Sequence, residues 1–121
     1  MSVTVYHYPA CGSCRKALAW LRKRGIDVSL EHLVDSPPSR EILEGLWRRS
    51  GLPLRRFFNT SGVSYRQGGF KDRLPKMSES EALEALAADG KLIKRPVIDT
   101  GAAVLVGFNE ALYASEFGGS P

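Results

Sequence analysis

The spacing of hydrophobic residues predicts a strand followed by a helix at the start of the chain. Residues 3–6 form a short β-prone run. After a short loop, Cys14, Leu18 and Leu21 recur at helical spacing. The helix is expected to end at Gly25, since glycine readily adopts the left-handed conformation that closes many helices.

An alternating pattern comes next. Ile26, Val28 and Leu30 are separated by polar residues, as in a half-buried strand. Strand, helix and strand then make a βαβ unit, in which the two strands are parallel and the connection is right-handed. Ligand sites of such units lie beyond the carboxyl ends of the strands. Cys11 and Cys14 fall at that edge.

The middle of the chain reads as mostly helical. Residues 35–39 break the preceding strand and supply helix-start signals, and an apolar helical face then runs from Ile42 to Gly51. A short helical turn at 53–58 and a polar loop at 59–62 follow. Further on, the Ser-Glu-Ser-Glu run at 78–81 is a capping box, and the helix it starts is expected to end at Asp89-Gly90.

Two strands and a helix complete the pattern. Residues 97–99 and 104–106 are β-prone and joined by a glycine-containing turn, which predicts a hairpin before a last helix at about 110–117. The order predicts an α/β fold: a single domain, 1–118, with a thioredoxin-like core (β-α-β … β-β-α, mixed sheet) at about 1–34 and 91–118. A helical subdomain is inserted at about 35–90, and 119–121 form a C-terminal tail.

Composition narrows the class of protein. With 121 residues, 43% hydrophobic and 25% charged, the chain is typical of one globular domain. The net charge is +4, but basic and acidic residues are interleaved, and the basic cluster at 22–24 suits a helix C-terminus. Direct nucleic-acid binding is therefore not expected. Neither a signal peptide nor an apolar run near the roughly 18 residues of a membrane span is present, which favours a cytoplasmic protein without a membrane partner.

The cysteine pair is the strongest candidate for chemistry. Cys11 follows a predicted strand and precedes a predicted helix, so its sulfur lies beside free N–H groups and the positive end of the helix dipole. A thiolate is favoured there, and Arg15 and Lys16 add positive charge. Cys11 is expected to attack a disulfide or an oxidised substrate, and Cys14, one turn inward, to resolve the mixed intermediate.

Two other interpretations fit the cysteine pair less well. A role as small buried side chains alone suits an exposed loop poorly. A zinc site would need two more ligands, and the available histidines, His7 and His32, match no common zinc-finger spacing. No metal and no bound cofactor are therefore expected.

A second informative position is the Arg95-Pro96 pair. Pro96 directly precedes an apolar strand and can start it without losing a ladder hydrogen bond. In a thioredoxin-like arrangement this proline is cis and faces the cysteine, with Arg95 beside the thiolate. The alternative is that Arg95 is a solvated surface side chain.

Five short segments together form a known pattern: 8–17 (YPACGSCRKA), 58–62 (FNTSG), 76–79 (KMSE), 92–96 (LIKRP) and 106–108 (VGF). The chain resembles the arsenate reductase family on these segments, over residues 2 to about 118. Its CxxC and Asn-Thr-Ser-Gly segments are more similar to the branch that contains the Spx-type transcription regulators and their uncharacterised relatives.

The resemblance implies a thiol-dependent oxidoreductase, linked in this family to arsenic resistance. Cys11 would attack arsenate, Arg95 would hold the oxyanion, and glutathione with glutaredoxin, or thioredoxin, would supply electrons. The substrate-binding residues would be Gly12, Ser13, Asn59, Arg95 and Pro96. The sequence departs from the glutaredoxin-linked reductases, since Asn59 and Phe108 stand where those enzymes have further arginines.

The regulator branch implies an alternative function. There, the chain would bind RNA polymerase, and Cys11 and Cys14 would form a redox-active disulfide switch instead of a catalytic couple. The helix around 45–49, or the basic pairs at 48–49 and 55–56, would supply the partner surface. The same pairs are also typical of solvated helix faces.

Overall fold

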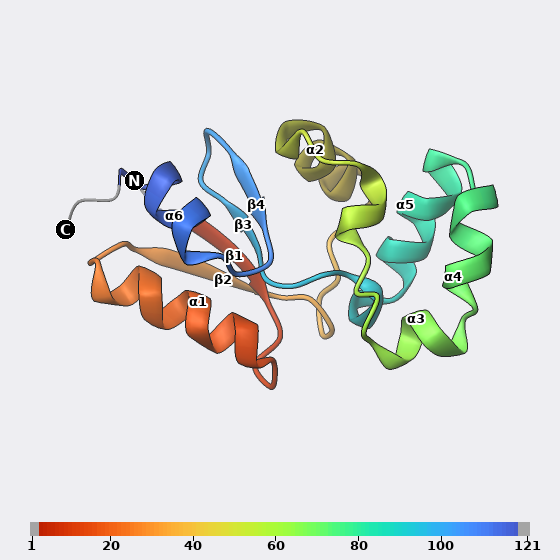
Figure 1. The fold of residues 1–121 in the computed structure, drawn as a ribbon, viewed down its shortest axis with the longest axis horizontal. Helices are drawn as coiled ribbons and strands as arrows, with labels where there is room; N and C mark the ends of the chain where they lie inside the picture. Colours follow the sequence, from red (N-terminus) through yellow and green to blue (C-terminus); the bar gives the residue numbers. More distant parts are fainter. Residues whose placement is uncertain (1–2, 119–121) are drawn as a thin grey trace.

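The computed structural model describes residues 3–118 and is elongated, with the strands at one end and a group of helices at the other (Figure 1). The predicted tail at 119–121 lies outside the described residues. Among residues 3–118, no helix is long and apolar enough to cross a membrane. The elements, with η denoting a 3-10 helix, are β1 Val3–His7, α1 Gly12–Lys23, β2 Val28–His32, α2 Arg40–Ser50, η1 Leu54–Phe57, α3 Val63–Gln67, α4 Phe70–Arg73, η2 Leu74–Lys76, α5 Glu79–Ala88, η3 Gly90–Leu92, β3 Val97–Asp99, β4 Val104–Val106 and α6 Glu110–Glu116.

The strands form one mixed sheet in the order β2-β1-β3-β4. β1 and β2 are parallel, as the βαβ pattern predicts, whereas β3 pairs antiparallel with both β1 and β4. The register places Val5 opposite Ile98, and Ile98 opposite Leu105. The α/β class with a mixed sheet is therefore confirmed.

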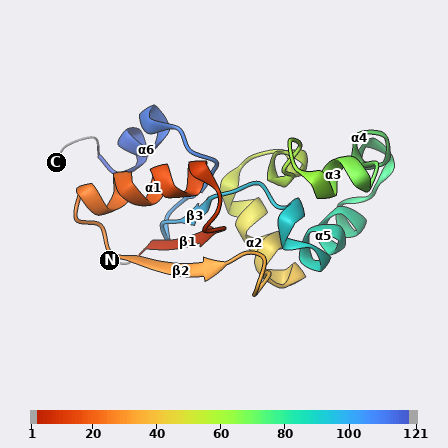
Figure 2. The ribbon, with the colours of Figure 1, turned by 90° about the horizontal axis from the view of Figure 1, so that it is seen from below.

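One face of the sheet is covered by α1 and α6, which lie on the same side of it (Figure 2). We call these two helices and the four strands the sheet layer. Its core holds alternate residues of β1, such as Val3 and Val5, together with Leu18 and Leu21 from α1 and Tyr113 from α6. The period-two burial of β1 and the helical spacing in α1 explain why these segments form these elements.

The helices between β2 and β3 form the second region, which we call the helical insertion (residues 40–92). Its core includes Leu43, Phe57 and Leu83, and it extends onto the other face of the sheet at Val97 and Val104. The insertion therefore shares its core with the sheet instead of standing apart from it.

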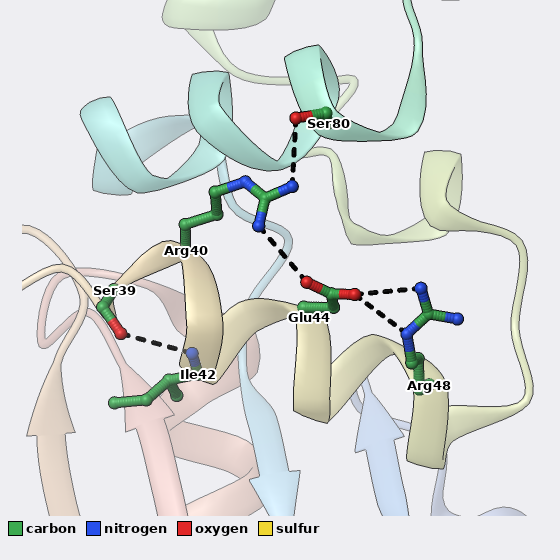
Figure 3. Close-up of polar contacts among 6 residues, drawn as sticks. All are labelled: Ser39, Arg40, Ile42, Glu44, Arg48 and Ser80. Carbon is green, nitrogen blue, oxygen red and sulfur yellow. Dashed lines mark hydrogen bonds and ion pairs between the residues drawn. The ribbon is translucent and has the colours of Figure 1, made fainter.

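Polar contacts fix α2 within the insertion (Figure 3). Ser39 caps its first turn by accepting a hydrogen bond from the Ile42 N–H. Arg40 reaches Ser80 near the start of α5 at 3.0 Å and also pairs with Glu44. Glu44 pairs in turn with Arg48, so one carboxylate joins two arginines along the helix.

Several local predictions are confirmed. Ser78 and Glu81 form the predicted capping box, Gly25 and Gly51 adopt positive φ angles after their helices, and the hairpin lies where the pattern predicts it.

The second strand differs from its prediction. It begins at Val28 instead of Ile26 and is mostly exposed, not half-buried; Leu30 is 43% exposed. The reason is its position at the sheet edge, where β1 is its one strand neighbour within residues 3–118. The short helices α3 and α4, by contrast, have no counterpart in the sequence prediction.

Candidate functional site

Cys11 occupies the N-cap of α1, where its backbone is extended and the helix begins at the next residue. Its own N–H donates to the Tyr8 carbonyl at 2.9 Å, and its carbonyl accepts from the Arg15 N–H. The tight turn after β1 therefore directs the Cys11 sulfur at the free amides of the first helical turn. This is the predicted placement.

Hydrogen bonds favour the thiolate of Cys11. Burial alone would raise the pKa of this thiol, but the nearby Cys14 N–H and thiol, the Arg95 side chain and the Ser13 N–H favour the thiolate, and the net effect lowers the pKa below the usual value. Cys11 is half-buried, so the thiolate remains accessible to a substrate. These are the properties of an attacking cysteine.

Cys14 has the opposite properties. It is fully buried on the inner side of α1, and burial raises its pKa to about 12, with further contributions from the neighbouring Cys11 thiolate. The Tyr8 N–H donates to its sulfur at 3.5 Å. Both cysteines are free thiols in this structure. Cys14 is therefore a protonated thiol next to the Cys11 sulfur.

Arg95 lies beside the cysteines, as expected, instead of on the open surface. The Arg95 side chain is close enough to Cys11 to lower the pKa of that thiol, and its guanidinium carbon lies 4.9 Å from the centre of the Tyr8 ring. Its Nη1 donates to the Lys91 carbonyl at 3.4 Å, and its buried Nε has no hydrogen-bond partner among the described residues. The bond between Arg95 and Pro96 is cis, as the thioredoxin-like pattern predicts.

A cavity of about 400 Å³ opens next to this cluster. Tyr8 and Arg95, which both contact Cys11, form one side of it. The other lining residues come from the helical insertion and the loop before α3: Asn59, Gly62, Val63, Ser64, Gln67 and Lys91. The lining holds two cations, several amide and hydroxyl groups and no carboxylate, so it suits an anionic ligand.

The remaining predicted site residues fall in different places. Asn59 lines the cavity, whereas Gly12 and Ser13 form the first turn of α1 beneath the Cys11 sulfur. Phe108 does not line it; its ring is partly buried and packs edge-on against Tyr113, with the ring centres 5.2 Å apart, against the core of the sheet layer. The structure thus brings together Cys11, Cys14, Arg95 and the loop that holds Asn59.

The two histidines considered as zinc ligands lie near each other, with ring centres 5.9 Å apart. His32 accepts hydrogen bonds at Nδ1 from the Val34 and Asp35 amides, which close the turn after β2. Within residues 3–118, no three His, Cys, Asp or Glu side chains are grouped as a metal ion would require.

Sequence reasoning missed several residues of the site. Lys91, Ser64 and Gln67 lie far from the cysteines in the chain and reach the cavity only through folding of the insertion. Tyr8 belongs to the motif segment, but the stacking of its ring on Arg95 has no sequence signal. Tyr113 is a buried support: its hydroxyl donates to the Gly107 carbonyl at 2.6 Å.

Comparison with known proteins finds one matching family model and several similar proteins. The model of the ArsC family matches residues 6–115. The uncharacterized protein YusI of Bacillus subtilis (strain 168) is 52% identical over 110 residues, which cover 91% of this chain and 93% of YusI. An arsenate reductase of Rhizobium meliloti (strain 1021) is 37% identical, over 81% of this chain and 69% of the relative.

A transcriptional regulator and a solved crystal structure are also similar to this chain. The global transcriptional regulator Spx of Streptococcus pyogenes (serotype M3) is 29% identical, over 89% of this chain and 79% of that protein. A crystal structure from Bacteroides fragilis, described as ArsC family related, superimposes with a TM-score of 0.91 at 41% identity, over 95% of this chain and 97% of that one. The thioredoxin-like fold predicted from the order of elements is thereby confirmed.

Proposed function

This chain belongs to the ArsC family, and on that basis we propose that it is a thiol oxidoreductase that reduces arsenate or a related oxidised substrate through Cys11 and Cys14. The observation that carries the proposal is the difference between the two thiols. The pKa of Cys11 is lowered and its sulfur is accessible, whereas the pKa of the buried Cys14 is raised to about 12.

The chemistry follows from that difference. The Cys11 thiolate replaces one oxygen of arsenate, which leaves as water, and a sulfur–arsenic bond forms. The Cys14 thiol, after losing its proton, then attacks the Cys11 sulfur. A Cys11–Cys14 disulfide forms, the sulfur–arsenic bond breaks, and its electron pair reduces As(V) to As(III), which leaves as arsenite.

The buried position of Cys14 sets the order of these steps. While Cys11 is a thiolate, its charge and its hydrogen bond with Cys14 help to keep Cys14 protonated. Once Cys11 is covalently bound, both effects disappear, and the pKa of Cys14 falls toward the value that burial sets. Attack by Cys14 is therefore favoured more after the first step than before it.

Arg95 supports the anionic substrate. Its guanidinium and the neighbouring Lys91 both line the cavity and give it a positive side, which suits a tetrahedral dianion. The amide of Asn59 and the partly buried ring of Phe108 stand in place of two arginines and offer no charge. We therefore expect weak saturation by arsenate.

The electrons come from an external thiol. A glutaredoxin with glutathione, or a thioredoxin, would reduce the Cys11–Cys14 disulfide by exchange: a donor thiolate attacks the half-buried Cys11 sulfur, and Cys14 leaves and takes up a proton. A second donor thiol then attacks the mixed disulfide and forms the donor's own disulfide. The lowered pKa of Cys11 makes it a good leaving group in this second step, so the reduced couple is restored.

Arsenate-dependent oxidation of a thiol tests the proposal. The purified protein is incubated with arsenate and, in turn, with glutathione plus glutaredoxin or with thioredoxin plus its reductase. Turnover is expected with at least one reductant and is expected to disappear in Cys11→Ser. Turnover that persists in Cys11→Ser would contradict the role of Cys11, and no reduction of arsenate or of a model disulfide with any donor would contradict the enzyme class.

A second candidate function is a redox-sensing regulator of the Spx type that binds RNA polymerase. Its support is the similarity to Spx and the direct contact between the two thiols, which equally suits a disulfide switch. This function predicts no arsenate turnover and capture of RNA polymerase that depends on the redox state of Cys11 and Cys14. Pull-down with the reduced and the oxidised protein separates it from the enzyme.

A further inference from the structure

A second cavity, of about 530 Å³, lies wholly within the helical insertion. It is formed by η1, the α3–α4 segment with η2, and the start of α5. Neither cysteine and no residue of the sheet layer lines it. Its volume is within the range of small-molecule sites, about 300 to 1,000 Å³. The chemistry proposed above makes no use of it.

The inner wall of this cavity is apolar. Leu54 and Ala82 are buried at its floor, while Leu74 and Met77 are half-buried along its side. Tyr65 adds an aromatic surface, and the flexible side chain of Met77 adapts readily to ligands of varied shape. Such a wall gains free energy when an apolar group replaces water against it.

The rim of the cavity is cationic. Arg55 and Arg56 come from η1 and Lys71 from α4, and all of them are exposed. Among the described residues no hydrogen bond or ion pair occupies these side chains. Glu79 is the one carboxylate of the lining. The rim therefore carries an excess of positive charge without internal partners, unlike Arg48 and Arg49, which are both paired.

The start of α5 does not account for this charge preference. Ser78 lines the cavity, but its hydroxyl and its N–H are both engaged in the capping box with Glu81. Attraction for an anion must come from the free arginine and lysine side chains of the rim.

We propose that this cavity binds a small amphipathic anion, with its apolar body against Leu54, Leu74 and Met77 and its carboxylate between Arg55, Arg56 and Lys71. A neutral apolar molecule would leave the cations unpaired, and a compact polar anion would leave the apolar wall in contact with water. A medium-chain carboxylate satisfies both parts of the lining.

The site is separate from the cavity beside Cys11, but the two share a wall. The loop 59–60 and helix α3 stand between them: Thr60 and Tyr65 face the anion site, whereas Asn59 and Ser64 face the other cavity. Binding can therefore be assigned to one cavity or the other by the residues that respond.

Titration with sodium decanoate, below its micelle concentration, tests the proposal by amide-resolved NMR of the full chain. We expect saturable shifts concentrated at Tyr65, Lys71 and Met77. The neutral analogue decanol and the compact anion acetate are each expected to bind at least tenfold more weakly. Decanol binding as tightly as decanoate would overturn the proposal, and so would shifts concentrated at Asn59 and Ser64.

Charge-matched variants complete the test. The triple variant Arg55→Gln, Arg56→Gln, Lys71→Gln is expected to weaken decanoate binding about tenfold, as the loss of several solvent-screened ion pairs implies. Its control, Lys16→Gln, Arg22→Gln, Lys23→Gln, removes the same formal charge from the exposed surface of α1 and should leave binding unchanged. Equal effects of both variants would show nonspecific attraction and overturn the site.

A filling variant provides an independent check. Thr60 is exposed and lines the cavity, so Thr60→Trp is expected to abolish decanoate binding while the free energy of unfolding stays near that of the parent. Unchanged affinity in the folded Thr60→Trp variant would contradict the assigned cavity.

Discussion

The sheet layer holds the two thiols, whereas the helical insertion holds most of the groups around the cavity next to them. In the sheet layer, a single turn between β1 and α1 sets the environment of both cysteines: Tyr8, Ser13 and the helix amides are all within six residues of one of them. In the insertion, Ser64, Gln67 and Lys91 reach the cavity from separate elements.

The sheet layer therefore determines the reactivity of the thiols, and the helical insertion provides most of the groups that would recognise a substrate. The acidity of Cys11 depends mainly on local hydrogen bonds, with Arg95 as the contribution from a distant segment. Recognition of a substrate depends on how the insertion is joined to the sheet layer. Two contacts, which we call joints, connect the insertion to the sheet layer. At the first, Gly90 lies against the Leu33 carbonyl after β2. At the second, both terminal nitrogens of Arg49 in α2 donate to the carboxylate of Asp99 in β3.

The largest effect is expected inside the sheet layer, from Cys14→Ser. Steady-state turnover with thioredoxin should fall by about three orders of magnitude, because no internal thiol resolves the Cys11 intermediate. Mild oxidation of the parent should close an intramolecular Cys11–Cys14 disulfide, seen as a loss of two mass units without dimer formation. Finding only mixed or intermolecular disulfides would favour a single-cysteine mechanism.

Breaking the first joint should cost nearly as much, this time in stability. A Cβ at Gly90 would overlap the backbone carbonyl of Leu33, so Gly90→Ala should lower the free energy of unfolding by about 3 kcal/mol. The control is Gly45→Ala on α2, where the space is open and a gain of up to about 1 kcal/mol is expected. Urea unfolding measures both; similar values for the two variants would mean that the insertion tolerates movement against β2.

Arg95 connects the two regions, and Arg95→Ala should lower kcat/KM for arsenate about 10- to 150-fold, as the loss of a charge-assisted hydrogen bond of roughly 1.5 to 3 kcal/mol implies. Reduction of a neutral disulfide should suffer less. The pKa of Cys11 should also rise, since the Arg95 hydrogen bond is one cause of its depression.

The neighbouring Lys94→Ala serves as the control for Arg95, because Lys94 is exposed and does not line the cavity. Micromolar arsenate binding that survives Arg95→Ala would contradict the assignment of Arg95 to the oxyanion.

The smallest effect is expected at the second joint. Arg49→Gln should destabilise the fold by about 1 kcal/mol, because the pair with Asp99 is well aligned but partly screened by solvent. Arg49 holds the pKa of Asp99 below its ordinary value. The stabilisation is therefore present above the unfolded pKa of about 3.9 and is lost as the pH falls through the folded pKa.

Unfolding of Arg49→Gln at neutral and at acidic pH measures this contribution. Arg48→Gln is the matched control, because Arg48 pairs with Glu44 within the same helix and joins no second region. A larger loss in the control would contradict the role of Arg49 as a joint.

The sequence predicts most of the sheet layer because its signals are local. The Ser78 capping box and the position of Gly51 after its helix likewise identify two helices of the insertion correctly. Helices α3 and α4 escape prediction, since each is at most five residues long and Phe70 is the single buried residue in them. The start of β2 is misjudged because pairing with Val3, and not local alternation, determines where the strand begins.

The site shows the same division. Cys11, Cys14 and Arg95 come together as the motif predicts, and Asn59 reaches the cavity. No pattern in the sequence identifies Lys91 and Gln67 as cavity residues, because they reach the cavity only when the insertion folds.

Alkylation of the two cysteines tests the central claim most directly. The reduced protein is treated with limiting iodoacetamide over a range of pH, and the modified positions are mapped by mass spectrometry. Because the pKa of Cys11 is lowered and that of Cys14 is raised to about 12, Cys11 should be modified first, with a midpoint below the ordinary value of a cysteine thiol. Modification of Cys14 ahead of Cys11, or at the same rate, would contradict the assignment of nucleophile and resolving thiol.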